Sequence, residues 1–312
     1  MRSMFLFSVV FALISAVQAE TNWPEFRGPH GNGHVDGASL PIAIDPSVVR
    51  WETPIHGKGW SSPVVWGDQI WLTTATEDGK QMSVICVDRP TGRILHDVVL
   101  QENEEPAFCH PMNSYASPTP AIEEGRIYIH FGSYLTVCLD TTSAEVIWQR
   151  RDLECDHYRG PASSPILYDG KLYVAYDGFD VQYVVALDKN TGETVWKRDR
   201  EIDYGTDNGD LKKAYCTSQI IDVGGEKQLV YPSAVASIAY DPQTGETLWT
   251  VYHDGMNASA RPIDGHGLVF ITNGMGAMVA VRPDGSGDVT GSHIEWSAER
   301  SVAKKSSLLL VD

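Results

Sequence analysis

The residues of this chain that are best suited to chemistry lie in four polar segments, not in one linear motif. These segments combine His, Arg, Lys, Asn and Tyr side chains, all of which donate or accept hydrogen bonds. The candidate ligand-binding residues are His110, Asn113, Tyr115, His157, Arg159, Lys213, Tyr215, Asn257 and Arg261. Aromatic rings, cations and amides that converge from several segments are typical of a binding site. The alternative is that these side chains bond only to one another and close off strand ends.

Two histidines raise the question of catalysis. His110 and His157 could act as metal ligands or as an acid–base pair. Neither belongs to a spacing typical of a metal site, and a single His in a loop is more often structural. The chain also contains no G-x-S-x-G motif and no phosphate-binding glycine loop. The sequence therefore predicts no catalytic residue and no metal ligand, and it favours a protein that is not an enzyme.

The five cysteines do not form a recognisable redox or metal motif. No two are adjacent and no C-x-x-C occurs, which excludes zinc knuckles, thioredoxin-type sites and covalent c-type haem. Cys86 and Cys138 occupy a repeat position that elsewhere holds Ala, so they are interpreted as small buried residues. Cys109 and Cys155 lie in equivalent loops. A disulfide between them and two free thiols are both open alternatives, because the sequence does not give their Cα separation. Cys216 would then be the unpaired cysteine.

One short segment alternates oxygen-bearing residues in the manner of a calcium loop. It is Asp284-Gly285-Ser286-Gly287-Asp288. An acidic ligand is missing at the expected place downstream. The segment is therefore interpreted as a long hairpin turn.

A repeated unit must position these segments. Each cycle begins with a serine at the start of a short apolar strand, at Ser62, Ser117, Ser164, Ser218, Ser259 and Ser307. These serines are on average about 49 residues apart. A period of about 40–50 residues with four short strands per cycle is the signature of a β-propeller. The sequence therefore predicts an all-β propeller of four-stranded blades, in which each polar segment joins one blade to the next.

The unit VVALDKNTGETVW (184–196) indicates how neighbouring blades are held together. Its third strand is almost entirely apolar, as expected where both faces of a sheet are buried. Thr-Gly supplies the turn, because glycine adopts a left-handed conformation without steric cost. In the first cycle His96 stands at the Trp position, so that junction is predicted to be less well packed. The predicted blade-docking residues are Trp51, Trp148, Trp196, Trp249 and Trp296.

The repeats resemble a known family. The units ALDKNTGETVW, AYDPQTGETLW and CVDRPTGRIL resemble the tryptophan-docking repeat of pyrroloquinoline-quinone (PQQ) type propellers. That superfamily contains the quinoprotein alcohol dehydrogenases and the non-enzymatic BamB-like proteins of the outer-membrane assembly machinery. The blocks WPEFRGPHGNG, HPMNSYASPTP and RDLECDHYRGPASSPIL also resemble exported propeller proteins of planctomycete-type bacteria.

The resemblance implies two different functions. The dehydrogenases hold PQQ over Ca²⁺ with Glu and Asn ligands, an Asp base and often a disulfide between adjacent cysteines. None of these residues can be matched here, so no cofactor is predicted, and PQQ and Ca²⁺ lack support from the residues. The leading interpretation is a non-enzymatic binding or scaffold propeller of the cell envelope, whose loops around the central channel bind a protein or a glycan. The alternative is a PQQ-dependent alcohol or sugar dehydrogenase-like oxidoreductase with diverged or missing catalytic residues.

The chain divides into three predicted parts. Residues 1–19 read as a signal peptide, with Arg2 before a short apolar run and small residues at the cleavage position. Residues 20–50 form an irregular arm, and residues 51–312 form the propeller domain. Trp51 is expected in an isolated closing strand and SSLLLVD (306–312) in the first strand of a sixth blade. The chain is therefore expected to be a C-terminally truncated fragment, with five blades and a partial sixth of an eight-bladed propeller.

Charge and targeting limit the partners. The formal net charge is −17, which disfavours nucleic acid and anionic membrane surfaces. The apolar run near the N-terminus is too short to span a bilayer. The protein is thus predicted to be exported to the periplasm or outside the cell, without membrane insertion after signal cleavage.

Overall fold

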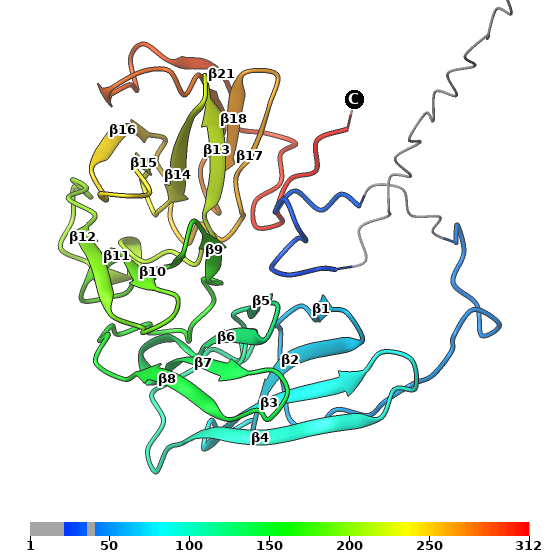
Figure 1. The fold of residues 1–312 in the computed structure, drawn as a ribbon. Helices are drawn as coiled ribbons and strands as arrows, with labels where there is room; N and C mark the ends of the chain where they lie inside the picture. Colours follow the sequence, from blue (N-terminus) through cyan, green and yellow to red (C-terminus); the bar gives the residue numbers. More distant parts are fainter. Residues whose placement is uncertain (1–21, 36–40, 312) are drawn as a thin grey trace, which may run out of the picture.

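The regular secondary structure of the described residues consists of β-strands, apart from two short 3-10 helices. The computed structural model describes residues 22–35 and 41–311, so the predicted signal peptide lies outside the described residues. Five sheets follow one another in sequence order around an arc (Figure 1), and we number them blades 1 to 5. This confirms the predicted all-β architecture of four-stranded blades. No helix in the described ranges is long and apolar enough to cross a membrane.

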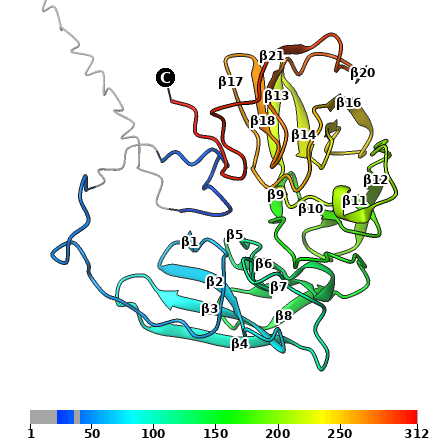
Figure 2. The same cartoon turned by 180° about the vertical axis from the view of Figure 1, so that it is seen from behind.

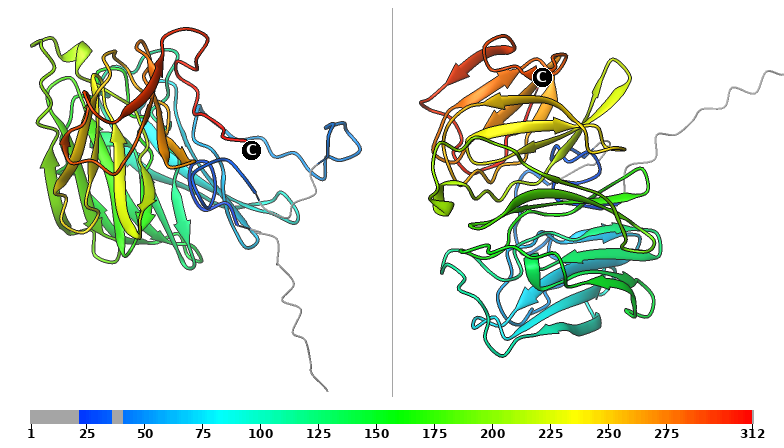
Figure 3. Two further views of the ribbon diagram at one scale, coloured as in Figure 1. Left: turned by 90° about the horizontal axis from the view of Figure 1, so that it is seen from above. Right: turned by 90° about the vertical axis from the view of Figure 1, so that its left-hand side faces the viewer.

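Blades 1 to 3 are simple antiparallel meanders. Blade 1 consists of β1 (Val64–Trp66), β2 (Gln69–Ala75), β3 (Gln81–Asp88) and β4 (Ile94–Glu102). Blade 2 consists of β5 (Ala121–Glu123), β6 (Arg126–His130), β7 (Thr136–Asp140) and β8 (Val146–Arg150), with the short 3-10 helix η1 (Gly132–Tyr134). Blade 3 consists of β9 (Ile166–Tyr168), β10 (Lys171–Asp177), β11 (Gln182–Asp188) and β12 (Thr194–Asp199). Figure 3 shows from two further sides how these sheets follow one another.

Blade 4 has a fifth strand, which comes from the chain segment between two strands of blade 5. Blade 4 consists of β13 (Gln219–Val223), β14 (Glu226–Pro232), β15 (Ala236–Tyr240) and β16 (Thr247–Tyr252), preceded by the 3-10 helix η2 (Gly209–Leu211). Blade 5 consists of β17 (Ile263–Gly265), β18 (Leu268–Thr272), β19 (Met278–Val281) and β21 (Ile294–Ala298). The intervening β20 (Gly287–Asp288) pairs in parallel with β16. The segment from Asp284 to Asp288 therefore extends the preceding blade by one strand, which neither a calcium loop nor a plain hairpin turn would do.

The hydrophobic core lies between adjacent blades. The third strand of each blade is buried along almost its whole length, as in β3, β7 and β11. Successive apolar clusters each combine residues of two neighbouring sheets, so that Val84 packs with Ile127 and Val185 packs with Tyr128. Each blade thus buries one face of its strands against the blade before it and the other against the blade after it.

Three of the tryptophans dock on the turn of the following blade. Trp148 donates its indole N–H to Lys189 O at 2.9 Å, and Trp196 donates to Pro242 O at 3.0 Å. Trp51 makes the same bond to Arg89 O at 2.8 Å, although it lies outside any strand. Each ring lies against the glycine of the Thr-Gly turn, at Gly92, Gly192 and Gly245.

The two other junctions use a glutamine in place of the tryptophan. At the first, Gln69 Nε2 donates to Thr141 O at 2.8 Å, and Gln69 Oε1 accepts from Trp71 Nε1 at 3.1 Å. His96 stacks on Trp71 with ring centroids 5.7 Å apart, so this junction is held by a Gln–Trp pair.

The second glutamine junction joins blades 4 and 5. There, Gln228 Nε2 donates to Pro283 O at 3.1 Å and Gln228 Oε1 accepts from the fully buried Trp249 at 2.8 Å. Trp296 is 41% exposed and lies against Phe270 of its own blade.

The recurring hydroxyls at the strand starts form a second set of links between blades. Ser62 N donates to Thr119 Oγ1, Thr119 N to Ser164 Oγ and Ser164 N to Thr217 Oγ1, at 2.9, 2.9 and 3.0 Å. Arg261 N donates to Ser307 Oγ at 3.0 Å in the same way. A small hydroxyl therefore recurs here because it satisfies a backbone N–H of the preceding blade. Residues 306–311 lie beside blade 5 in this manner but form no β-strand.

A glycine substitution at a docking turn tests the tryptophan contact. Gly192 has φ +74° and a Cβ there would lie about 2.5 Å from the Trp148 ring, whereas Gly170 has φ +76° and open space around it. Gly170→Ala should cost about 1 kcal/mol from backbone strain alone. Gly192→Ala should cost about 1–3 kcal/mol more, because the ring must move. Urea unfolding of both variants measures the difference, and equal losses would contradict the docking role.

The N-terminal segment 22–35 crosses the inner side of the arc. It begins beside blade 1, where Trp23 forms an antiparallel bridge with Val65. It ends near the C-terminal segment, where His34 Nε2 lies 2.7 Å from Leu310 O. Figure 2 shows the two segments side by side from the back. Sequence-distant parts of the chain are thereby tied together across the arc.

Candidate functional site

The loops between blades converge on a small cavity. Each connects the fourth strand of one blade to the first strand of the next, so the sheet topology brings them to the same end of the molecule. They enclose a pocket of about 270 Å³, here called the loop pocket. Its lining residues are His110, Met112, Asn113, Arg159, Ala162, Tyr215, Asn257, Ser259 and Lys305. Five of the nine candidate residues from the sequence are among them: His110, Asn113, Arg159, Tyr215 and Asn257.

Backbone bonds hold these loops in place. His110 N donates to Arg159 O at 3.3 Å, and Asn113 Nδ2 donates to the same oxygen at 2.9 Å. Tyr215 N donates to Ala258 O at 2.7 Å. Each loop is therefore fixed by the loop of the neighbouring blade, and the pocket is preformed.

Two cations bond to one carboxylate beside the loop pocket, and a third lies close to them. Arg159 Nη2 lies 3.3 Å from both Asp210 oxygens. The fully buried Lys213 contacts Asp210 Oδ1 and also donates to Asn257 Oδ1 at 3.1 Å. Lys305 donates to the Asn257 carbonyl oxygen at 3.1 Å.

Burial and neighbouring positive charges lower the pKa values of Lys213 and Lys305. Burial, followed by the charges of Arg159 and Lys305, lowers the pKa of Lys213 to about 8. Burial also lowers the pKa of Lys305, and Arg159 contributes to this. The Asp210 carboxylate beside Lys213 Nζ favours the ammonium form of Lys213.

The remaining candidate residues lie outside this lining. Tyr115 donates its hydroxyl to Ala107 O at 2.7 Å. His157 is partly buried, and its Nε2 accepts from Ser133 N at 3.1 Å. Burial lowers the pKa of His157 to about 4, so the ring is neutral at pH 7. His157 and His110 line different cavities, so the structure does not bring them together as an acid–base pair.

The disulfide between Cys109 and Cys155 is not formed. All five cysteines are free. Cys109 Sγ lies 3.7 Å from Arg159 O, while Cys155 Sγ lies 3.8 Å from His157 Nδ1. Each thiol is thus held in its own loop, as in the second of the two alternatives. Burial raises the pKa of Cys109 to about 11, which keeps it a thiol at neutral pH.

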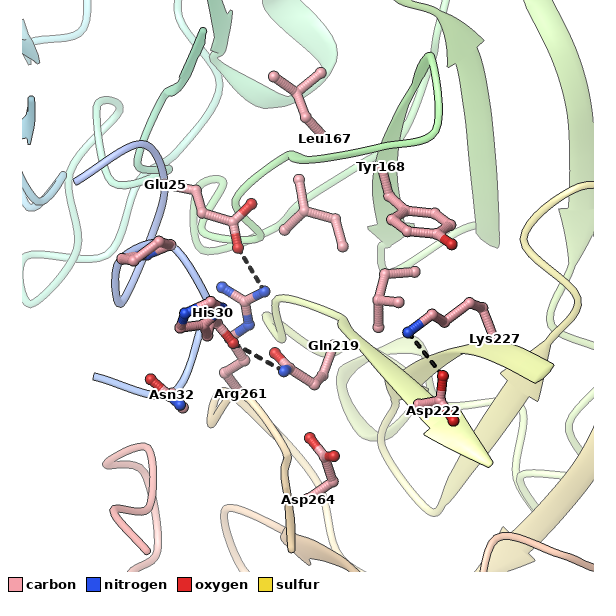
Figure 4. A pocket seen from close by; sticks show the side chains of 13 residues that line it. Glu25, His30, Asn32, Leu167, Tyr168, Gln219, Asp222, Lys227, Arg261 and Asp264 are labelled. Atoms are coloured by element: carbon pink, nitrogen blue, oxygen red, sulfur yellow. Dashed lines mark hydrogen bonds and ion pairs between the residues drawn. The ribbon is translucent and has the colours of Figure 1, made fainter. Parts of the chain in front are cut away.

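Arg261 belongs to a different cavity, which we call the arm pocket (Figure 4). This pocket of about 410 Å³ lies between the first strands of blades 3 to 5 and the N-terminal segment. Arg261 is 2% exposed and lies 2.7 Å from Glu25 Oε1, and Gln219 Nε2 donates to His30 O at 3.0 Å. Burial raises the pKa of Glu25, against the opposing effect of the Arg261 charge. Arg261 therefore holds the N-terminal segment.

Some lining residues were not predicted from the sequence. Lys305 of the loop pocket follows the last complete blade and precedes the segment 306–312. Glu25 of the arm pocket lies in a segment without periodicity. Their only sequence signal was the basic pair Lys304-Lys305 and the Gly-rich composition of residues 27–33.

The loop pocket does not fit a calcium ion. Ca²⁺ takes six to eight oxygen ligands. The charged groups here are three cations, and the one carboxylate, Asp210, already bonds to two of them. Within residues 22–35 and 41–311 no group of three or more His, Cys, Asp or Glu could hold a metal ion. The residues therefore give no support to a PQQ–calcium centre in this pocket.

Known structures share this fold. The first is a quinohemoprotein alcohol dehydrogenase from Comamonas testosteroni, with 13% identity, a TM-score of 0.63, and 89% of this chain and 49% of that protein covered. BamB from Moraxella catarrhalis is 18% identical, with a TM-score of 0.51 and coverage of 80% and 64%. A europium-containing methanol dehydrogenase is 12% identical, with a TM-score of 0.56 and coverage of 77% and 50%. The chain thus spans between about half and two thirds of the length of these proteins.

The sequence comparisons identify the family. A search among curated proteins finds no match to this chain. A family model described as outer membrane protein assembly factor BamB matches residues 34–174 and 80–309. Because these matches cover well over half of the chain, and the blades carry the tryptophan-docking repeat, the chain belongs to this BamB-like family of PQQ-type propellers.

Proposed function

We propose that this chain is a binding or scaffold module of the cell envelope and that its ligand, a protein or a glycan, occupies the loop pocket. The observation that carries the proposal is the convergence of side chains from successive blades on one preformed cavity. The family description, an outer membrane protein assembly factor, supports a role in the cell envelope. Since the chain matches only part of each similar structure, this function is proposed for the part of the protein seen here.

Blocking the loop pocket tests this function. Ala162 lines the pocket, and Ala162→Trp would fill it with an indole ring. Val195 on β12 is 47% exposed and outside the pocket, so Val195→Trp is the matched control. Immobilised protein is exposed to the protein and glycan fractions of an envelope extract, and retained molecules are measured by mass spectrometry. We expect a ligand that wild type and Val195→Trp retain equally and that Ala162→Trp retains at least about tenfold less.

Two results would overturn the proposal. Equal retention by Ala162→Trp, once circular dichroism shows that it is folded, would mean that the pocket does not bind the ligand. Stoichiometric PQQ binding with dye-linked alcohol oxidation would instead favour the oxidoreductase alternative.

A further inference from the structure

The loop pocket carries an excess of positive charge in an acidic protein. Arg159 and Lys305 line it and Lys213 lies beside it, while Asp210 is the carboxylate to which Arg159 and Lys213 bond. The Tyr158 ring is a second partner for two of these cations, with Arg159 5.6 Å and Lys213 5.4 Å from its centroid. A ring face offsets less charge than a carboxylate. One further anionic group would therefore be stabilised in the pocket.

Two polar atoms of the lining also lack partners. Arg159 Nε and Tyr215 Oη are buried and form no hydrogen bond with the described residues. Such atoms normally bond to protein, water or a ligand, because an unsatisfied buried donor costs about 1–3 kcal/mol. Both belong to side chains that line the loop pocket.

The remaining lining sets the shape of the ligand. Met112, Ala162 and the Tyr215 ring contribute apolar groups to the lining, while His110 and Asn113 contribute polar side chains. A cavity of about 270 Å³ is small for a ligand site and suits a body of about one sugar ring. A sugar ring presents C–H groups on its face and hydroxyls at its edge, which matches this mixed lining.

Long-range charge limits the ligand further. The whole chain carries a formal charge of −17, so a polyanion is repelled before it reaches the local cations. A single carboxylate suffers much less from this repulsion. We propose that the loop pocket binds a carboxylate-bearing sugar, with the carboxylate between Arg159 and Lys305 and the ring against Tyr215. This inference rests on the proposed binding function and specifies the chemistry of its ligand.

Titration with small probes tests the proposal. Galacturonate, galactose, acetate and inorganic phosphate are titrated into the full chain by calorimetry at about 50 mM salt, where surface charges are less screened. We expect galacturonate to bind at least about tenfold more tightly than galactose, because charge-assisted hydrogen bonds are about twice as strong as neutral ones. Acetate and phosphate should bind at least about tenfold more weakly than galacturonate, because they lack the ring.

Adjacent lysines provide a matched pair of variants. Lys305 and Lys304 are both exposed and each donates to a backbone carbonyl, at 3.1 and 3.0 Å, but only Lys305 lines the pocket. Lys305→Met should weaken galacturonate binding about tenfold and leave the weak galactose binding unchanged. Lys304→Met should leave both unchanged.

The failures can be told apart. Equal binding of galactose and galacturonate would overturn the role of the carboxylate, and equal binding of acetate or phosphate would overturn the role of the sugar ring. Absence of binding by all four probes would overturn the inference as a whole. The proposed function would still be judged separately, by the retention of envelope ligands in wild type and Ala162→Trp.

Discussion

Replacing Asp177 with asparagine is expected to lower the free energy of unfolding by about 3–5 kcal/mol. Asp177 ends β10 and its side chain is 0% exposed, while Arg200 follows β12 and is 1% exposed. Arg200 donates two hydrogen bonds to the carboxylate, at 2.8 and 2.5 Å. Removing the negative charge would leave the arginine charged, buried and without its counter-ion.

The pair also connects two blades. Arg200 Nη1 lies 3.4 Å from the carbonyl oxygen of Tyr231 on β14, and its guanidinium lies 5.1 Å from the centre of the Tyr231 ring. Burial alone would lower the pKa of Arg200, but the charge of Asp177 and its hydrogen bonds outweigh this and raise it. The arginine therefore stays protonated in the core, and the loss should be felt at the junction of blades 3 and 4.

Urea unfolding at pH 7 measures the effect. Asp199→Asn is the control, because Asp199 is an exposed aspartate at the end of β12 in the same blade, and it should change stability by less than about 0.5 kcal/mol. The double variant Asp177→Leu with Arg200→Met should recover most of the loss, since no charge remains buried. A loss of under about 1 kcal/mol in Asp177→Asn would show that the pair is not needed in its charged form.

Acidification from pH 7 to pH 5 is expected to destabilise the protein by about 2 kcal/mol for each of His130 and His157. Burial, with a contribution from His157, lowers the pKa of His130 to about 3. Burial lowers the pKa of His157 to about 4 and also lowers that of His253. Below pH 6.5 the unfolded chain binds protons at His130 and His157, whereas the folded chain does so only near their lowered pKa values. Stability therefore falls as the pH drops from the unfolded pKa towards the folded ones.

Urea unfolding at pH 7, 6 and 5 measures this loss of stability. Two variants distinguish the effect of histidine protonation from the effect of a lost packing contact. His130 Nδ1 lies 2.9 Å from Thr136 Oγ1. His130→Leu should reduce the pH dependence, because one titrating ring is removed. Thr136→Val should lower stability at every pH and keep the wild-type slope, because the ring remains. A stability that stays constant between pH 7 and 5 would contradict the assignment of neutral buried rings.

The repeat made the blade architecture predictable from the sequence. Thr-Gly turns and apolar third strands serve contacts within a blade or between neighbouring blades. They therefore recur in the sequence with a period of about 49 residues. The repeat did not reveal how the junction at His96 is held. A weaker contact was predicted there, but Gln69 and Trp71 supply the bond to Thr141 that a docking tryptophan makes elsewhere. The repeat position of His96 did not indicate this replacement, because Gln69 and Trp71 lie on β2 whereas His96 lies on β4.

The polar sites were likewise only partly predictable from the sequence. The sequence by itself determined which loops carry polar side chains and that these loops share one end of the blades. Only the tertiary structure decided that Arg159 and Lys305 meet beside one cavity, while Arg261 pairs with Glu25 across 236 residues of chain. Strand periodicity reports which face of a strand is buried, and it is a local property. The meeting of charges from distant blades depends instead on how the sheets are set around the arc, which no local pattern encodes.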